Sequence, residues 1–282
     1  MTASLNTPPP FTPKIIFFDI DDTLSRNGVL DPINQALLEA LAQTDVKVVI
    51  ATGRPKPFLP DDVLALFDAG IFDAIICTNG QYNFKKDGII SHYPLTPEQT
   101  DGMANLCETA DLVYKFDSAE HLAWASIDDH FYALIKDRPH AVVDKDYRNS
   151  HTVYQCSVFF TTPKNADEPS QTTQKNVSTL DADALAKQSL KLVMWHHMGG
   201  DILPVDASKA RAVQDVCDYF NISVNEAMAF GDGFNDIEMF KLVGHAVAMG
   251  DAEPSLKEHA NQVTGSIEEG GIETVIKEFG LI

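Results

Sequence analysis

Three aspartates stand close together near the start of the chain, in the run Asp19-Ile20-Asp21-Asp22-Thr23-Leu24. A single Asp or Thr at this position would suit a turn or a helix cap. Three carboxylates this close repel one another and disfavour their charged forms unless a cation holds them together. The run therefore predicts a metal site.

A second acidic run, Gly231-Asp232-Gly233-Phe234-Asn235-Asp236, follows another apolar stretch. A glycine-rich turn with an aspartate cap explains its first two residues but not the whole run. If both runs meet at one edge of a sheet, Asp19, Asp21, Asp232 and Asp236 form an all-oxygen cluster. Oxygen ligands of this kind favour Mg²⁺ over Zn²⁺.

Other residues offer groups that bind phosphate. Thr52 and Gly53 follow an apolar run, and a hydroxyl with free backbone N–H groups can hold phosphate oxygens. Lys209 is the first residue of an expected helix. A lone lysine on a helix is usually solvated, so the role of Lys209 depends on the other residues of the site. Arg54 could offset the acidic surface near a phosphate or pair with a carboxylate of the core.

Together these groups predict phosphoryl transfer. One carboxylate attacks phosphorus and forms an aspartyl-phosphate. A second protonates the leaving oxygen and later activates water. Mg²⁺ and a lysine neutralise the charge of the transferring group, and a hydroxyl orients it.

The elements that must position these residues are short apolar strands. Buried strands are expected at Lys14 to Phe18, Val46 to Ala51, Asp73 to Thr78 and Ala227 to Asp232, with helices between them. This alternation predicts right-handed crossovers and a parallel sheet. In such sheets ligands bind beyond the carboxyl ends of the strands, where the acidic runs lie.

The alternation of strands and helices stops after the third expected strand. Residues 81–84 and 89–93 flank an Asp-Gly hairpin signal, and the following region mixes helix and strand, including an expected exposed loop at 161–179. The sequence thus predicts an α/β fold with a doubly wound, Rossmann-like parallel-sheet core at residues 1–82 and 200–282. An α+β insertion, residues 83–199, would form a cap.

Four motifs resemble, in order, those of the haloacid dehalogenase superfamily: D-I-D-D-T-L, A-T-G-R, the Ser208-Lys209 pair and G-D-G-F-N-D-I-E-M-F. The insertion is flanked by C-T-N-G-Q (Cys77 to Gln81) and D-A-S-K (Asp206 to Lys209), and its position is similar to the large class IIB (C2B) cap of the Cof-like branch. The resemblance covers both core segments. Within the insertion it extends only to position and size.

The resemblance implies a role for each matching residue. Asp19 would be the nucleophile and a metal ligand, and Asp21 the general acid/base that also binds the metal through its backbone carbonyl. Asp232 would bind Mg²⁺, with support from Asn235 and Asp236, while Thr52 and Lys209 would bind phosphate. Asp22 stands where glycine is common in the family, and its charge could either tighten metal binding or alter the turn.

The charge balance restricts the partners. The 282 residues carry 21 Lys plus Arg against 41 Asp plus Glu, a net charge of -20. Such a surface repels nucleic acids and anionic lipid. No signal peptide or membrane span is recognisable, so we expect a cytoplasmic protein, with its oligomeric state left open.

The predicted function is Mg²⁺-dependent hydrolysis of a small phosphorylated metabolite, a sugar phosphate or a phosphorylated cofactor. A phosphomutase or phosphotransferase would use the same core residues, because the cap chooses the acceptor. A non-catalytic metabolite-binding protein is a weaker alternative, since every acid that the chemistry needs is present. A signalling receiver domain would lack the large insertion.

Overall fold

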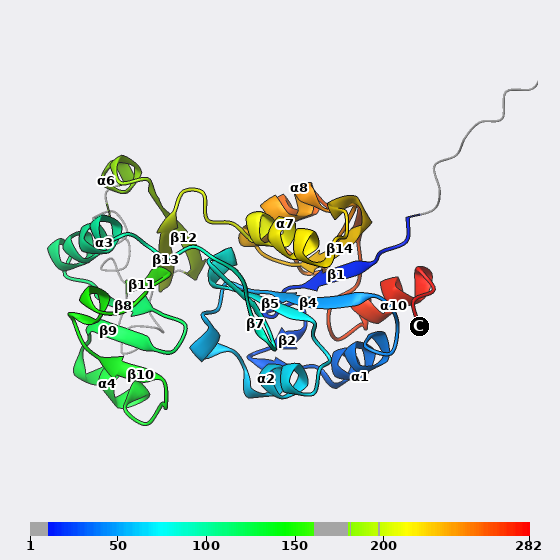
Figure 1. Cartoon of the computed structure of the whole chain (residues 1–282), viewed down its shortest axis with the longest axis horizontal. Helices are drawn as coiled ribbons and strands as arrows, with labels where there is room; N and C mark the ends of the chain where they lie inside the picture. Colours follow the sequence, from blue (N-terminus) through cyan, green and yellow to red (C-terminus); the bar gives the residue numbers. More distant parts are fainter. Residues whose placement is uncertain (1–10, 161–179, 181, 197) are drawn as a thin grey trace, which may run out of the picture.

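The computed structural model describes residues 11–160, 180, 182–196 and 198–282 (Figure 1). The expected loop at 161–179 lies outside them. Two large sheets, one of eight strands and one of six, form separate parts of the molecule. No helix in the described part of the chain is long and apolar enough to cross a membrane.

The eight-stranded sheet has the order β16-β15-β14-β1-β4-β5-β6-β7. The strands from β16 to β5 run parallel, and the hairpin β6–β7 adds two antiparallel strands at one edge. The central strands are buried on both faces, as their apolar runs predict. The bounds are β1 Ile15–Phe18, β4 Lys47–Ala51, β5 Ala74–Cys77, β6 Tyr82–Lys85, β7 Gly88–His92, β14 Ala227–Gly231, β15 His245–Ala248 and β16 Gln262–Val263.

Helices cover both faces of this sheet. Helices α1 (Pro32–Leu41), α2 (Asp61–Asp68) and α10 (Gly271–Glu278) lie on one face, and α7 (Lys209–Phe220) and α8 (Ile237–Leu242) lie on the other (Figure 1). A short helix α9 (Pro254–Lys257) and a small ribbon, β2 (Ser25–Arg26) with β3 (Val29–Leu30), complete this part. The doubly wound α/β prediction is confirmed.

The strand order places the acidic runs together. Strand β1 lies between β4 and β14, with Phe18 paired in register to both Ile50 and Phe230. Crossovers lead away from β1 in opposite directions on its two sides, which makes this the topological switch point of the sheet. Segments that directly follow β1, β4 and β14 therefore meet at one edge.

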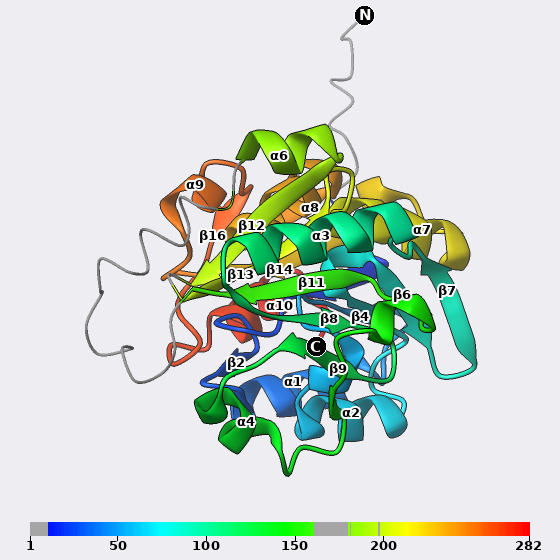
Figure 2. The ribbon, with the colours of Figure 1, turned by 90° about the vertical axis from the view of Figure 1, so that its left-hand side faces the viewer.

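The second sheet has the order β10-β9-β8-β11-β13-β12 and is antiparallel except for the β10–β9 pair. Helix α3 lies over its outer face, and the opposite face is turned toward the core (Figures 1 and 2). The bounds are α3 Pro97–Thr109, β8 Val113–Asp117, β9 Leu122–Ser126, α4 Asp129–Ile135, β10 Ala141–Val143, β11 Gln155–Phe159, α6 Ala182–Lys187, β12 Leu190–His196 and β13 Gly199–Pro204.

The membership of the strands bears on where the cap begins and ends. Strand β7 belongs to the eight-stranded sheet, although its residues fall inside the predicted insertion of 83–199. Strand β13 belongs to the six-stranded sheet, although most of it falls in the predicted core segment of 200–282. We therefore propose that the cap starts after His92 and ends near Pro204.

Candidate active site

A buried lysine joins two of the predicted carboxylates. Lys209, the first residue of α7, donates hydrogen bonds from Nζ to Asp19 Oδ1 and to Asp236 Oδ1, each at 2.6 Å. The Lys209 side chain has no exposed surface, and Asp236 is also fully buried. Ser208 caps the helix, since its hydroxyl accepts from the Arg211 backbone N–H at 3.2 Å. The cap fixes the start of α7 and with it the position of Lys209.

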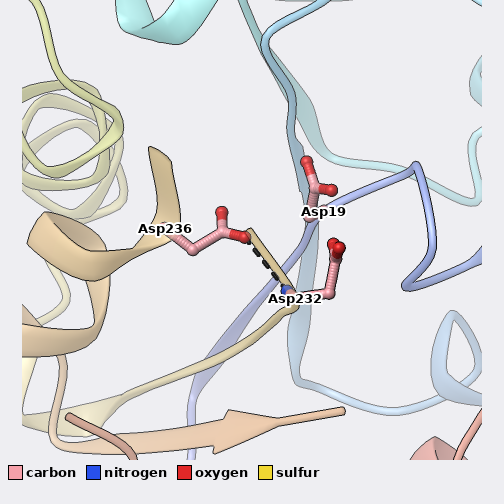
Figure 3. Close-up of side chains that lie close together, drawn as sticks. All are labelled: Asp19, Asp232 and Asp236. Atoms are coloured by element: carbon pink, nitrogen blue, oxygen red, sulfur yellow. Dashed lines mark hydrogen bonds between the residues drawn. The ribbon is translucent and has the colours of Figure 1, made fainter. Parts of the chain in front are cut away.

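Three carboxylates gather around this lysine. Carboxylate oxygens of Asp19, Asp232 and Asp236 all lie within 4.8 Å of one another, and Figure 3 shows the three side chains converging. Asp236 Oδ2 accepts from the backbone N–H groups of Asp232 and Gly233, each at 3.1 Å. A Cβ at Gly231 would lie 2.5 Å from Asp236 Oδ2, so the close approach requires glycine there.

Burial dominates the electrostatics of this cluster. It raises the pKa of Asp19 to about 7, an effect that Lys209 only partly offsets. Burial, together with the charges of Asp19 and Asp236, raises the pKa of Asp232 to about 8. Burial disfavours the charged lysine, but the two carboxylates outweigh it and raise the pKa of Lys209 above its ordinary value. The cluster thus holds an excess of negative charge that a divalent cation would balance.

The Asp21 side chain points elsewhere. Its two carboxylate oxygens accept from Arg54 Nε at 2.8 Å and Arg54 Nη2 at 2.7 Å. Arg54 is itself held by a hydrogen bond to the Phe58 carbonyl and by contact with the Phe58 ring. The sequence left two roles open for Arg54, to offset the acidic surface near a phosphate or to pair with a carboxylate of the core. The structure shows the ion pair, with Asp21.

Asp22 adopts a left-handed backbone conformation, with φ at 55°. This is the region that favours glycine, which gives a physical reason for glycine at this position in similar sequences. The Asp22 carboxylate pairs with Arg26 at 2.6 Å, and Arg26 also binds Asp251 and Glu268. Its charge is therefore used in an exposed ion-pair network beside the site.

The predicted phosphate-binding residues lie at the same sheet edge. Thr52 and Gly53 follow β4, and Thr52 Oγ1 accepts from the Arg54 backbone N–H at 3.1 Å, which leaves its own proton free to donate. Asn235 Nδ2 donates to Asn79 Oδ1 at 3.1 Å, and this pair packs against Gly53. Asn79, with φ at 51°, thus helps to shape the site through a strained turn.

A cavity of about 990 Å³ extends from this edge to the cap. Its core wall includes Asp19, Thr52 and Asp232. Its cap wall includes polar and aromatic residues of the second sheet, which are Lys115, Trp124, Gln155, Ser157, Phe159, Trp195 and Asp201. Apolar residues and one cation complete the cap wall: Leu122, Phe131, Leu134, Ile135, Arg138, Val193 and Met194. For Lys115, Gln155 and Ser157 the sequence holds a signal, because polar residues stand at the third and fifth positions of β8 and at the first and third positions of β11.

The family model for haloacid dehalogenase-like hydrolases matches residues 16–276. The chain belongs to this family. A putative phosphatase, YkrA of Bacillus subtilis (strain 168), is 30% identical over 278 residues, which cover 95% of this chain and 98% of the relative. The 5-amino-6-(5-phospho-D-ribitylamino)uracil phosphatase YwtE of the same organism is 26% identical and covers 94% and 98%.

Solved structures of haloacid dehalogenase-like proteins share the fold. The subclass IIB sugar phosphatase BT4131 matches with a TM-score of 0.79 at 27% identity, over 95% of this chain and 100% of that chain. This haloacid dehalogenase-like hydrolase is therefore an enzyme of the phosphatase type, with a Cof-like architecture of core and cap.

Proposed function

We propose that this chain is a Mg²⁺-dependent phosphatase that hydrolyses a small phosphorylated metabolite through a phosphorylated Asp19. The observation that carries the proposal is the buried Lys209 bridge between Asp19 and Asp236. It holds a nucleophilic carboxylate at the switch point of the sheet, at the base of a cavity large enough for a metabolite.

The donor set fits Mg²⁺. Asp19 and Asp232 offer carboxylate oxygens, while Asp236 holds Lys209 and two backbone N–H groups and so supports the site from behind. Among the described residues of the cluster, three carboxylates face one ammonium group. A bound Mg²⁺ would neutralise charge on the nucleophile and on the transferring phosphoryl group.

The protein's own groups suffice to describe the two transfers. An oxygen of Asp19 attacks phosphorus, and the bond from phosphorus to the leaving oxygen breaks. Asp21 gives that oxygen a proton, and then takes one from the water that attacks the phosphorylated Asp19. Phosphate leaves with the water oxygen, and Asp19 is regenerated. Thr52, Gly53 and Lys209 orient the phosphoryl oxygens throughout.

The ion pair between Asp21 and Arg54 limits when Asp21 can take part in these two transfers. Asp21 can act as acid and base only after it leaves Arg54, which now holds both of its oxygens. The Asp21 side chain is about half exposed, so a change of rotamer into the cavity meets little packing resistance.

The substrate class rests on the cavity and on the relatives. One relative is named for a phosphorylated ribitylamino compound and one structure for a sugar phosphatase, which supports a sugar or cofactor phosphate here. Water as the acceptor makes the chain a hydrolase, and an organic hydroxyl would make it a phosphotransferase. We keep the cytoplasm as the proposed location.

Phosphate release from a panel of phosphorylated metabolites tests the proposal. The wild type is measured with Mg²⁺ and with EDTA, beside Asp19→Asn. We expect Mg²⁺-dependent release that the variant lacks. No release by folded, Mg²⁺-loaded protein across the panel would refute hydrolysis, and transfer to an added sugar alcohol would then identify a phosphotransferase.

A further inference from the structure

The cap carries a buried charged cluster that the phosphoryl chemistry does not use. Lys115 on β8, Ser157 on β11 and Asp201 on β13 are register partners on three neighbouring strands. Asp117, two residues beyond Lys115, points to the same side of the sheet. All four residues are at least nine-tenths buried, and Lys115, Ser157 and Asp201 line the same cavity as Asp19.

Hydrogen bonds join the cluster into one network. Lys115 Nζ donates to Asp117 and, at 2.9 Å, to Ser157 Oγ. Ser157 Oγ lies 2.8 Å from Asp117 Oδ2 and 2.9 Å from Asp201 Oδ1, yet it has a single proton to give. The two carboxylates therefore compete for it. Burial raises the pKa of Asp201 to about 7, which allows Asp201 to supply a proton of its own.

Two buried polar atoms next to the network lack partners. Gln155 donates from Nε2 to Asp117 Oδ2 at 2.9 Å, but its Oε1 has no hydrogen-bond partner among the described residues. Trp124 Nε1 is likewise buried and unpaired in that part of the chain. Both residues line the cavity that contains Asp19. A buried acceptor and a buried donor without partners are costly, unless a bound molecule satisfies them.

A purely structural role explains this cluster less well. A buried ion pair rarely stabilises a fold more than apolar residues of the same size would. The opposite face of the same strands shows the apolar alternative, with Tyr114, Phe116, Cys156 and Val158 packed beneath α3. Polar residues were thus placed only on the face that lines the cavity.

We propose that Lys115, Gln155, Ser157 and Asp201 bind the leaving group of the substrate, and that they select an uncharged group bearing several hydroxyls. The inference rests on the proposed phosphatase function and names the substrate class of the same cavity. Hydroxyls both donate and accept, so they match the free Gln155 Oε1, the free Trp124 Nε1 and the lone pairs of Asp201. Phe159 and Trp195 line the same cavity, and their ring carbons can contact the C–H surface of such a group.

The charges of the cluster argue against a second anion on the substrate. Lys115 is the cation of the cluster, its Nζ already donates to Asp117 and Ser157, and the Asp117 carboxylate balances its charge, so a carboxylate or a second phosphate would find no free cation in the cluster. Arg138 also lines the cavity, where its guanidinium lies against the Phe58 ring of the core, 5.5 Å from the ring centre.

Four phosphate monoesters test the selection. Glucose 6-phosphate and sorbitol 6-phosphate carry uncharged hydroxylated groups, 6-phosphogluconate adds a carboxylate, and n-hexyl phosphate lacks hydroxyls. We expect the better of the first two to exceed 6-phosphogluconate in kcat/KM by about tenfold or more, and n-hexyl phosphate by about a hundredfold. The first pair also distinguishes a ring from an open chain.

Variants connect this preference to the cluster. Lys115→Met, Ser157→Ala and Asp201→Asn should each reduce the ratio of kcat/KM for the preferred hydroxylated ester over n-hexyl phosphate by about tenfold or more. Lys136→Met and Asp137→Asn, at exposed positions of the cap outside the cavity, serve as matched controls. A melting temperature for each variant shows that it folds.

The outcomes separate the two proposals. Equal turnover of all four esters, or a preference for 6-phosphogluconate, overturns the inference and leaves the phosphatase intact. The inference is also overturned if folded Lys115→Met, Ser157→Ala and Asp201→Asn keep the wild-type ratio of kcat/KM for the hydroxylated ester over n-hexyl phosphate. If the wild type releases no phosphate from these esters or from p-nitrophenyl phosphate, the proposed function fails and the inference fails with it.

Discussion

The Lys209 ammonium lies between the Asp19 and Asp236 carboxylates, 2.6 Å from an oxygen of each. Lys209 starts α7 on the C-terminal side of the cap, whereas the carboxylates follow β1 and β14. Two buried ion pairs that share Lys209 therefore join three segments that are distant in sequence. Loss of the cation would leave two buried carboxylates facing each other, which is costly for folding and catalysis alike.

Lys209→Met tests this ion pair, because methionine keeps an unbranched side chain without the charge. We expect kcat/KM to fall by about 10²-fold or more. We expect the free energy of unfolding in EDTA to fall by about 3–5 kcal/mol at pH 8. Lys241→Met, at an exposed position of α8, is the matched control. A fully active, equally stable Lys209→Met protein would refute the role of the lysine.

The role of Asp21 can be separated from that of Asp19 by the leaving group. Asp21→Asn removes the proposed proton donor, so hydrolysis of an alkyl phosphate should slow by about 10²–10⁴-fold. Hydrolysis of p-nitrophenyl phosphate should slow far less, because its leaving oxygen needs no proton. The measured quantity is kcat/KM for each ester, which reports the transfer to Asp19 and excludes the later attack of water, a step that uses Asp21 for both esters. An equal loss on both would assign Asp21 to binding instead.

Mg²⁺ should stabilise the folded protein through Asp232. At a free Mg²⁺ concentration of 100 Kd the gain is about 2.7 kcal/mol, seen as a rise in melting temperature. Asp232→Asn should lose most of this gain. In EDTA the variant should be no less stable than the wild type, because the substitution leaves two close carboxylates where the wild type has three. Asp251→Asn, in the exposed Arg26 network, controls for surface charge. An unchanged gain in Asp232→Asn would place the metal elsewhere.

The ionisation of Asp201 should make stability depend on pH. Burial raises the pKa of Asp201 to about 7 in the folded protein, against an ordinary 3.8. Between these values the folded state binds the additional proton, so stability falls as the pH rises and levels off above about 7. Asp201→Asn lacks this loss, which is at most about 4 kcal/mol.

The measurement is urea unfolding of both proteins in EDTA from pH 4 to 8. The stability of Asp201→Asn relative to the wild type should grow up to about pH 7 and then become constant. Carboxylates that are remote from Asp201 are common to both proteins, so their contributions cancel from the difference. A difference that does not vary with pH would mean that Asp201 ionises normally.

The core was predictable because its signals are local. Apolar runs such as Lys14 to Phe18 specify strands buried on both faces, and the polar residues that directly follow them mark the carboxyl edge of the sheet. Once β1, β4 and β14 are neighbours, Asp19, Thr52 and Asp232 must lie together. The choice of Arg54 as the partner of Asp21 could not be read in this way, since it depends on side-chain rotamers.

The inner face of the cap was not predictable from the sequence for a different reason. Several of its hydrogen bonds join residues on different strands, with Lys115 and Ser157 separated by 42 positions and Ser157 and Asp201 by 44. Charged residues are mostly exposed, so strands that bury them have a sequence pattern typical of loops. Strand β13, next to the returning core segment, was therefore assigned to the core.

The central claim is that Asp19 carries the phosphoryl group, and trapping that intermediate tests it most directly. Protein turning over a preferred ester with Mg²⁺ is quenched in acid, digested and analysed by mass spectrometry, beside Asp19→Asn. We predict one added phosphoryl group on the wild-type peptide that contains Asp19, and neither the label nor turnover in the variant. Turnover by Asp19→Asn, or a phosphoryl group on another residue, would contradict the account.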